Sequence, residues 1–377
     1  MDLIRKRRTV LSSALLLSLL ATAPAQATFI SVINLVTDDQ LANPAQITDP
    51  NLKNAWGMSY TLTGSPIWVS DNATHVSTLY NVNPVTNVTV KNNAITETIP
   101  GDGSVTGQVF NSVAGNFVAN GTSHNFLFVS EDGTISGRGV GNNADVLQAA
   151  SISNVYKGAA YAIIGGVGYL YAANFRAGTI DVVKGTGGPP GLAGTFTDPG
   201  IPTGYAPFNI QNLGGKLYVT YALQDGAKKD DVSGAGHGFV SVFDLQGNFL
   251  GRVASGGVLD SPWGLAIAPP TFGDFAGDLL VGNFGDGKIN VFDLISDAYL
   301  GPLLGGDGNP IVIDGLWGLI AGNGGNSGSP NKIYFSAGPN DETHGLFGVL
   351  AAIPEPATLL LVGLGAAALG FGRRRRA

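Results

Sequence analysis

The sequence predicts an all-β fold, and more particularly a six-bladed β-propeller, on three observations. Short runs rich in Val, Ile, Leu and Phe recur along the chain, separated by turns rich in Gly, Asn and Asp. Glycine contributes 56 of 377 residues, about twice average usage, which suits many tight turns. The runs form a unit of four strands that returns six times, about every 50 residues. Units of four strands at this spacing are typical of propeller blades.

The clearest unit spans residues 261–294. It predicts strands at 263–268, 279–283 and 288–294, and the Asp286-Gly287 pair between the last two is a strong hairpin signal. A unit of this kind cannot bury both of its faces alone, so copies of it are expected alongside. The other repeats are at 56–82, 105–140, 155–183, 206–245 and 316–350.

The two ends of the repeat array complement each other. The sixth repeat has no fourth strand of its own, and the alternating segment 29–36 has no partner nearby in the sequence. We expect this segment to complete the last blade, which would close the ring and remove an exposed sheet edge.

The N-terminus predicts export. A basic run at 5–8 precedes an apolar run at 10–20, and Ala25 and Ala27 form a small-x-small cleavage site. Residues 1–27 are therefore interpreted as a signal peptide and Thr28 as the mature start. A general secretory signal is favoured, and the adjacent arginines of the basic run leave a twin-arginine signal as the alternative.

The C-terminus has three parts in a fixed order. Pro354-Glu355-Pro356 is followed by an apolar helix at 357–372 and then by arginines, namely Arg373, Arg374, Arg375 and Arg376. This arrangement closely resembles the PEP-CTERM sorting signal of Gram-negative bacteria. The resemblance implies an exosortase that processes the exported protein, and a transmembrane helix that holds the precursor in the inner membrane. A plain tail anchor is the alternative. The predicted domains are thus 1–27, 28–352 and 353–377.

Charge and cysteine content exclude several classes of function. Outside the two targeting segments the chain has 12 basic and 25 acidic residues, a net charge of −13. Such a body disfavours nucleic acid and anionic lipid as partners, and suits neutral glycans or divalent cations. The chain has no cysteine, so disulfides and thiolate metal sites are absent.

Strand parity locates the candidate site. In a four-stranded meander, the start of the first strand and the turn after the second strand lie on the same rim. That rim collects these candidate ligand residues: Trp56, Glu131, Asn174, Trp263, Asn283 and Trp317. The Trp-Gly pairs are interpreted mainly as packing between blades, with an aromatic platform for sugars as the alternative.

The oxygen-bearing residues of the rim raise a second question. Glu131, Asn174 and Asn283 each end a second strand in a different repeat, so they are candidate ligands for Ca²⁺, which prefers oxygen donors. The competing interpretation is turn chemistry, because Asn and Asp are favoured in tight turns.

The repeats also resemble those of NHL and related six-bladed propellers. Pro262-Trp263-Gly264-Leu265-Ala266-Ile267 fits the first-strand pattern of that family, whereas the second and fourth repeats fit poorly. With the sorting tail, the chain resembles a conserved family of PEP-CTERM propeller proteins without an assigned biochemical role. Some similar propellers use Glu, Asn and Asp for metal-dependent hydrolysis, which is what the resemblance implies for the rim.

Taken together, these features predict an exported propeller that binds a ligand in the cell envelope or extracellular matrix of a Gram-negative bacterium. The predicted partners are an exosortase and an extracellular polysaccharide. The alternatives are a Ca²⁺-dependent hydrolase at the propeller mouth and a structural component of the exopolysaccharide matrix. No catalytic residue is assigned.

Overall fold

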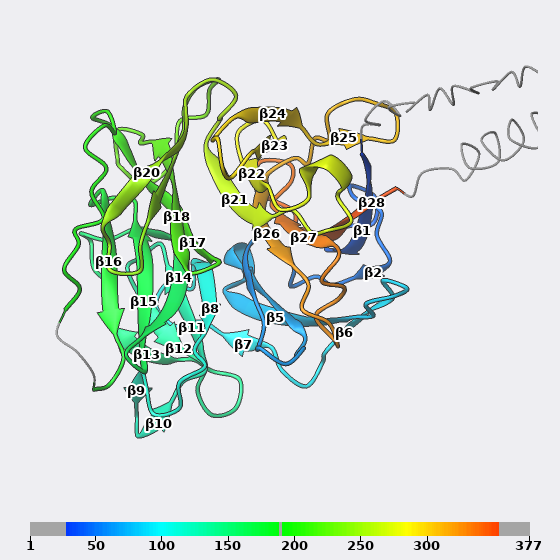
Figure 1. Cartoon of the computed structure of the whole chain (residues 1–377). Helices are drawn as coiled ribbons and strands as arrows, with labels where there is room; N and C mark the ends of the chain where they lie inside the picture. Colours follow the sequence, from blue (N-terminus) through cyan, green and yellow to red (C-terminus); the bar gives the residue numbers. More distant parts are fainter. Residues whose placement is uncertain (1–27, 188–190, 354–377) are drawn as a thin grey trace, which may run out of the picture.

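The computed structural model describes residues 28–187 and 191–353. Within them, six sheets of three or more strands follow one another along the chain (Figure 1). The predicted signal peptide with Ala25 and Ala27, and the sorting segment with Pro354, Glu355, Pro356 and Arg373–Arg376, lie outside the described residues. No helix in the described part of the chain is long and apolar enough to cross a membrane.

Each blade begins with an innermost strand. These strands are β3 (Ala55–Ser59), β8 (Val105–Phe110), β14 (Tyr156–Ile164), β17 (Tyr205–Leu213), β21 (Pro262–Ile267) and β26 (Leu316–Ala321). Each contacts the innermost strands before and after it, and β26 contacts β3, so the six form a closed ring. This confirms the predicted six-bladed propeller.

The second and third strands pair antiparallel outward from the ring. The second strands are β4 (Ile67–Asp71), β11 (Phe126–Ser130), β15 (Val167–Asn174), β18 (Lys216–Leu223), β22 (Leu279–Asn283) and β27 (Ile333–Ala337). The third strands are β5 (Val76–Val82), β12 (Ile135–Gly137), β16 (Thr179–Lys184), β19 (Phe239–Phe243), β23 (Ile289–Phe292) and β28 (Leu346–Ala352).

Five blades carry a fourth strand. These outer strands are β6 (Thr89–Lys91), β13 (Asp145–Gln148), β20 (Phe249–Ser255), β24 (Tyr299–Pro302) and β1 (Phe29–Thr37). Blade 3, made of β14, β15 and β16, has three strands in the described part of the chain. Short strands complete the molecule: β7 (Glu97–Thr98) pairs with β5, β2 (Ile47–Thr48) and β25 (Leu304–Gly305) pair with β1, and β9 (Val118–Ala119) pairs with β10 (Thr122–Ser123).

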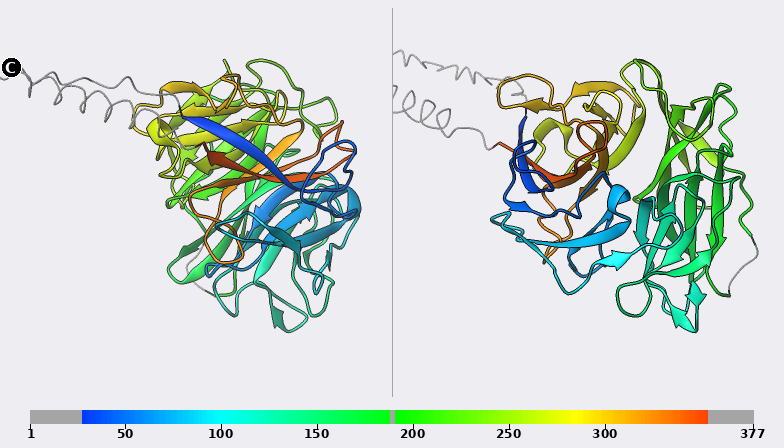
Figure 2. Two further views of the ribbon diagram at one scale, coloured as in Figure 1. Left: turned by 90° about the vertical axis from the view of Figure 1, so that its right-hand side faces the viewer. Right: turned by 180° about the vertical axis from the view of Figure 1, so that it is seen from behind.

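The ring closes as the sequence predicts. β1 pairs antiparallel with β28, from Ile30 opposite Ala352 to Thr37 opposite Leu346, with a register shift between Asn34 and Val36. Figures 1 and 2 show the dark blue β1 beside the orange-red β28. Joining the first described strand to the last ties the two ends of the ring together.

A shared irregularity shapes the innermost strands. In all six blades the pairing of the first two strands shifts register near the start of the innermost strand. Such bulges turn a side chain out of the regular pleat. In five blades a Gly follows the residue whose side chain the bulge turns out. In blade 4, Asn209 stands at the position of that Gly. A Cβ on Gly57 would lie 2.6 Å from the carbonyl oxygen of Thr106, so glycine allows neighbouring inner strands to approach backbone to backbone.

Candidate functional site

The predicted rim exists. In all six blades, the residue that precedes the innermost strand lies beside the residue that follows the second strand. The amide of Phe175 donates to the carbonyl of Val155 (2.8 Å), and the amide of Phe284 donates to that of Ser261 (3.0 Å). The loops after the second strands therefore gather at the starts of the innermost strands, at one end of the propeller axis.

Five side chains from four blades form what we call the charged mouth at this end: Glu131, Lys157, Asp230, Asp231 and Glu342. Lys157 belongs to β14, and the four carboxylates lie on loops that follow β11, β18 and β27. Glu131 is the one sequence-predicted site residue among them.

Three predicted tryptophans lie beneath the charged mouth. The rings of Trp56 and Trp317 stack with centroids 3.4 Å apart, and Trp263 packs edge-on at 6.0 Å from Trp56 and 5.9 Å from Trp317. Phe284 stacks on Trp317 at 3.9 Å, and Phe208 lies 5.7 Å away from Trp317. We call these five rings the aromatic plug. They come from blades 1, 4, 5 and 6, so they tie the ring together across the axis.

The tryptophans are too buried to form an open platform for a flat ligand. Trp56, Trp263 and Trp317 are only 2%, 4% and 1% exposed. The indole N–H of Trp317 donates to Asn54 Oδ1 (3.0 Å), and that of Trp263 donates to the carbonyl of Lys157 (3.1 Å). The geometry fits the packing interpretation of the Trp-Gly pairs, in which each ring contributes buried aromatic contact.

Lys157 is the central charge of the mouth. Its side chain is 3% exposed, bonds to Glu131, and lies 3.2 Å from Asp230 Oδ1. The ammonium also sits over the Trp56 ring, 5.1 Å from its centroid. Burial lowers the pKa of Lys157, but the carboxylates of Glu131 and Asp230 outweigh that effect and raise it. The side chain is therefore held as a cation. A buried lysine can keep its charge only when it has such partners.

Glu342 is the group best suited to exchange protons. Burial raises its pKa to about 7, although the nearby Lys157 charge opposes the shift. Burial likewise raises the pKa of Asp231. Glu342 also adopts a left-handed backbone (φ 62°), as do the two residues before it, Asn340 and Asp341 (φ 57° and 51°). Non-glycine residues held in this region are strained and cluster at functional sites.

The predicted calcium ligands do not fit a common cation site. Glu131 already pairs with the Lys157 ammonium. Asn174 Oδ1 accepts from the amides of Val155 and Ala177, and its amide group donates to Asp181 (2.8 Å). Hydrogen bonds from an Asn side chain to nearby backbone groups are typical of tight turns. In the described ranges, no group of three or more His, Asp or Glu residues is arranged to hold a metal ion.

Asn283 makes similar hydrogen bonds, but one of its polar atoms has no partner. Its amide group donates to the carbonyl of Val258 (2.8 Å) and to Asp286 Oδ1 (2.9 Å), while its Oδ1 is buried without a partner. It belongs to blade 5, whereas Glu131 and Asn174 belong to blades 2 and 3. One oxygen alone does not make a site for Ca²⁺, which takes six to eight oxygen ligands.

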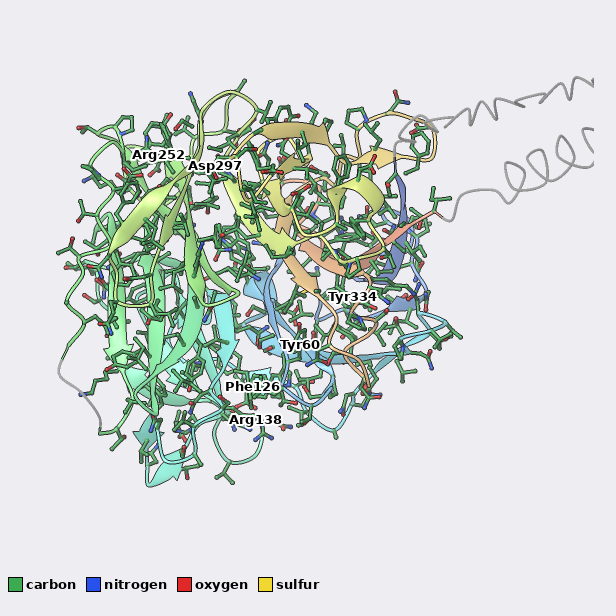
Figure 3. All side chains as sticks on the ribbon, viewed as in Figure 1. Tyr60, Phe126, Arg138, Arg252, Asp297 and Tyr334 are labelled. Carbon is green, nitrogen blue, oxygen red and sulfur yellow. The ribbon has the colours of Figure 1, made fainter. Side chains whose placement is uncertain are left out.

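A second region lies on the other side of the aromatic plug. We call it the axial pocket: a cavity of about 180 Å³ lined by the later residues of β3, β8, β14, β17 and β26, with Trp263 also in its wall. Because the charged mouth lies at the starts of the innermost strands, the pocket occupies the opposite end of the axis. Figure 3 shows Tyr60, one of its lining residues, near the middle of the view.

The axial pocket is uncharged and combines polar with apolar side chains. Its hydrogen-bonding side chains are Ser59, Tyr60, Gln108, Tyr161, Asn209, Gln211 and Asn212. Several already hold the ring together: Gln108 donates to the carbonyl of Gly57 (2.8 Å), and Asn209 donates to that of Trp263 (2.8 Å). Burial raises the pKa of Tyr60 to about 12, so its hydroxyl stays protonated and donates to the carbonyl of Ala321 (2.6 Å).

Ser59 is the exception in this pocket. It is 6% exposed, and its hydroxyl has no hydrogen-bond partner. A buried hydroxyl without a partner costs free energy, so each such group in a folded protein asks for an explanation. A ligand bound in the axial pocket would supply the missing partner.

Sequence reasoning missed the axial pocket and most of the charged mouth. Lys157 stands in its repeat where Trp56, Trp263 and Trp317 stand in theirs, directly before the shared glycine. Aligning the six repeats on that glycine was the available signal. Blade 4 obscures the alignment, because Asn209 replaces the glycine there.

Comparison with known proteins defines the class first. Residues 352–376 match the PEP-CTERM protein-sorting motif. With the observed fold, this makes the protein an exosortase-sorted, exported six-bladed β-propeller, and the motif implies a membrane-anchored precursor in a Gram-negative bacterium.

Two relatives then define the family. Uncharacterized protein R648 of Acanthamoeba polyphaga mimivirus is 35% identical over 325 residues, which cover 81% of this chain and 76% of the relative. Uncharacterized protein L690 of the same virus is 34% identical over 319 residues, covering 80% and 81%. The chain belongs to the family of these proteins.

Among solved structures, the Penicillium chrysogenum α-L-arabinanase complexed with arabinobiose superposes with a TM-score of 0.50. The match has 12% sequence identity and covers 85% of this chain and 98% of the arabinanase. At this identity the likeness concerns the fold alone.

Proposed function

We propose that the protein is a binding protein of the cell envelope or extracellular matrix, and that the axial pocket is its ligand site. The unpartnered hydroxyl of Ser59 carries this proposal, because it is a buried polar group without a protein partner on a residue that lines the cavity. A preformed concave site with a few convergent polar groups is the usual form of a small-molecule site.

The lining indicates the class of ligand. Serine, tyrosine and amide side chains both donate and accept hydrogen bonds, and none of the lining residues carries a formal charge. A neutral, hydroxyl-rich ligand matches this set, whereas an anionic one would meet no cation. The cavity, about 180 Å³, is smaller than the sites of drug-sized molecules, so it suits one sugar ring or the end of a polysaccharide chain.

The test compares matched serines and matched sugars. Titration calorimetry with glucose, galactose and arabinose is expected to give binding that glucuronate does not give. Ser59→Ala is expected to weaken binding about tenfold, the effect of one lost hydrogen bond of roughly 1.4 kcal/mol, without lowering the melting temperature. Ser70→Ala is the control, because Ser70 is also buried and unpartnered in blade 1 but does not line the pocket.

Two results contradict the proposal. Equal weakening by Ser59→Ala and Ser70→Ala would mean that the pocket is not the site. If no neutral sugar at millimolar concentration produced heat or a chemical-shift change, sugars would be excluded as the class of ligand.

A hydrolase working at the charged mouth is the second candidate. It is favoured by the pKa of about 7 at Glu342 beside the buried Lys157, because a carboxyl that titrates near neutral pH suits general acid–base catalysis. Hydrolysis of glycoside, lactone or phosphoester substrates that peaks near pH 7 and is lost in Glu342→Gln would support it. Loss of that hydrolysis on adding a chelator would favour the calcium-dependent form.

A further inference from the structure

Blade 3 differs from the other five blades at its outer edge. Its third strand, β16 (Thr179–Lys184), pairs with β15 along its whole length. Along residues 180–183, its other edge pairs with no strand in the described part of the chain. The backbone N–H and C=O groups that point outward there form the row that the other blades cover with a fourth strand.

A cavity of about 550 Å³ runs beside this edge. Ile180 and Val182 point to one face of β16, while Asp181 and Val183 point to the other, yet all four line the same cavity. A space touched by both faces of a strand must lie along its edge. Gln148, at the end of the outer strand β13 of blade 2, lines it too.

The far wall of the cavity is a strap of chain from the loop that leads to blade 4. We define the strap as residues 192–198, of which Leu192, Gly194, Thr195 and Phe196 line the cavity. Within the described residues, main-chain hydrogen bonds join the strap to blade 4. The amides of Gly194 and Phe196 donate to the carbonyls of Gln246 and Gly247 (2.9 and 3.0 Å).

The end of the strap is also fixed on blade 4. Asp198 accepts from Arg252 Nε (2.9 Å) and from the hydroxyl of Ser241 (2.6 Å). Figure 1 shows the described chain that leads up to β17 passing outside β16. Because the strap is fixed to blade 4, it forms the outer wall of the cavity, and the cavity of about 550 Å³ lies between the strap and the edge of β16.

We propose that the edge of β16 is a strand-addition site, which binds an extended peptide segment of a partner protein as the fourth strand of blade 3. Main-chain hydrogen bonds to β16 supply affinity, and the apolar wall of Ile180, Val182 and Leu192 takes alternate small apolar side chains. Only a polypeptide backbone offers donors and acceptors at the spacing that a strand edge presents.

Charge selects among the occupants of this site. The one charged side chain that lines the cavity is the carboxylate of Asp181, and the body of the protein carries a net charge of −13. A neutral or basic peptide is attracted, whereas a second copy of this acidic chain is repelled. The strap beside the edge also leaves room for a single extended segment rather than for a folded neighbour.

The probe for the test is the synthetic peptide KTVTVTVTK, in which apolar and polar side chains alternate and both ends are basic. Its affinity for the exported protein is measured by fluorescence anisotropy. Hydrogen exchange of the outward-facing amides of Ile180 and Val182 is followed with and without it. We expect binding that slows exchange of those amides at least tenfold and leaves β22 unchanged. The same peptide with N-methylated backbone amides is expected not to bind.

A matched pair of variants tests where the peptide binds. Thr195 and Thr197 are both exposed on the strap, but only Thr195 lines the cavity. Thr195→Trp is expected to weaken peptide binding at least tenfold by filling the cavity, while Thr197→Trp leaves it unchanged. Both are surface changes that leave the fold intact.

Four results overturn the proposal. They are equal binding of the N-methylated peptide, equal effects of the two tryptophan variants, no binding at millimolar peptide, or slow exchange of the Ile180 and Val182 amides in the free protein. Protection that rises with protein concentration in the absence of peptide would assign the edge to a second copy instead.

Discussion

The two ends of the propeller axis differ in the residues that form them. The charged mouth consists of one buried cation and four carboxylates, and all the carboxylates lie on loops. The axial pocket consists of neutral side chains on the innermost strands, each of which is paired with the second strand of its blade. Between them lies the aromatic plug, in which Trp263 both lines the pocket and donates to the backbone of Lys157.

The contrast explains why the two ends suit different tasks. Charges from loops depend on one another, so removing one leaves the others unbalanced in a poorly hydrated place. Neutral groups on paired strands keep their geometry when a ligand arrives, so little order must be gained on binding. The mouth is thus suited to proton exchange and the pocket to recognition of an uncharged molecule.

The largest expected effect is at the centre of the mouth. Lys157→Met keeps the length of the side chain but leaves Glu131 beside the aromatic plug without its cation, which should destabilise the protein by about 3–5 kcal/mol. Lys288→Met is the control, since Lys288 pairs with Asp286 at the surface (3.0 Å) and is expected to cost less than about 1 kcal/mol. Denaturant unfolding measures both. Equal losses would mean that the mouth is no more tightly coupled than the surface.

Removing one ring of the aromatic plug is expected to destabilise the protein nearly as much, and to connect the charged mouth with the axial pocket. Trp263→Ala removes a buried ring that touches Trp56 and Trp317, with a loss of about 3–5 kcal/mol. It should also let water pass between the mouth and the axial pocket. A fall in the pKa of Glu342 toward its usual range, followed by NMR, would check that. An unchanged pKa would show that the mouth is sealed by other groups.

The pH dependence of stability separates the mouth from a more deeply buried carboxyl elsewhere. Burial raises the pKa of Glu97, at the border of blades 1 and 2, to about 7, and that of Glu342 to about 7 as well. Both bind a proton more tightly when folded than when unfolded. Their stabilising contribution is complete below about pH 4.5 and is lost as pH rises through 7.

The melting temperature should therefore fall between pH 5 and pH 8. Glu97→Gln should remove part of that fall, of the order of 1–3 kcal/mol, because Glu97 is wholly buried. Glu342→Gln should remove less, because Glu342 is partly exposed and faces Lys157. A melting temperature that rises over this range would contradict both assignments.

Calcium is expected to have the smallest effect. If Glu131 is held by Lys157 rather than by a metal, millimolar Ca²⁺ should leave the melting temperature of the wild-type protein unchanged. A rise that disappears in Glu131→Gln would restore the calcium site predicted from the sequence. Asn174→Ala is a useful second variant, since its bonds to the turn predict a loss of stability that does not depend on calcium.

Much of the architecture was readable from the sequence, because it depends on local patterns. The turn signals and the period of about 50 residues predict six blades. The unmatched segment 29–36 predicts the closing strand, which the pairing of β1 with β28 confirms. The prediction of four strands per blade did not anticipate that blade 3 has three strands in the described part of the chain, because a repeat without its fourth strand looks like a repeat with a longer loop in the sequence.

The candidate site was only partly predictable. Parity correctly assigned Glu131 and the tryptophans to one rim, since it follows from the alternating direction of strands. It said nothing about their partners. That Lys157 neutralises Glu131, that Asp230 and Glu342 arrive from blades 4 and 6, and that the tryptophans stack into a plug are contacts between residues 26 to 261 positions apart.

By itself, then, the sequence determined the six-bladed ring, its closure and the sorting motif at residues 352–376, because each depends on a repeat or on a contiguous segment. The tertiary structure alone decided the rest. Closing the ring brings six innermost strands to one axis, and only there do burial, charge pairing and packing choose between a metal site, an ion pair and an aromatic core. The same closure created the uncharged axial pocket, because its lining comes from five different strands that meet only at the axis.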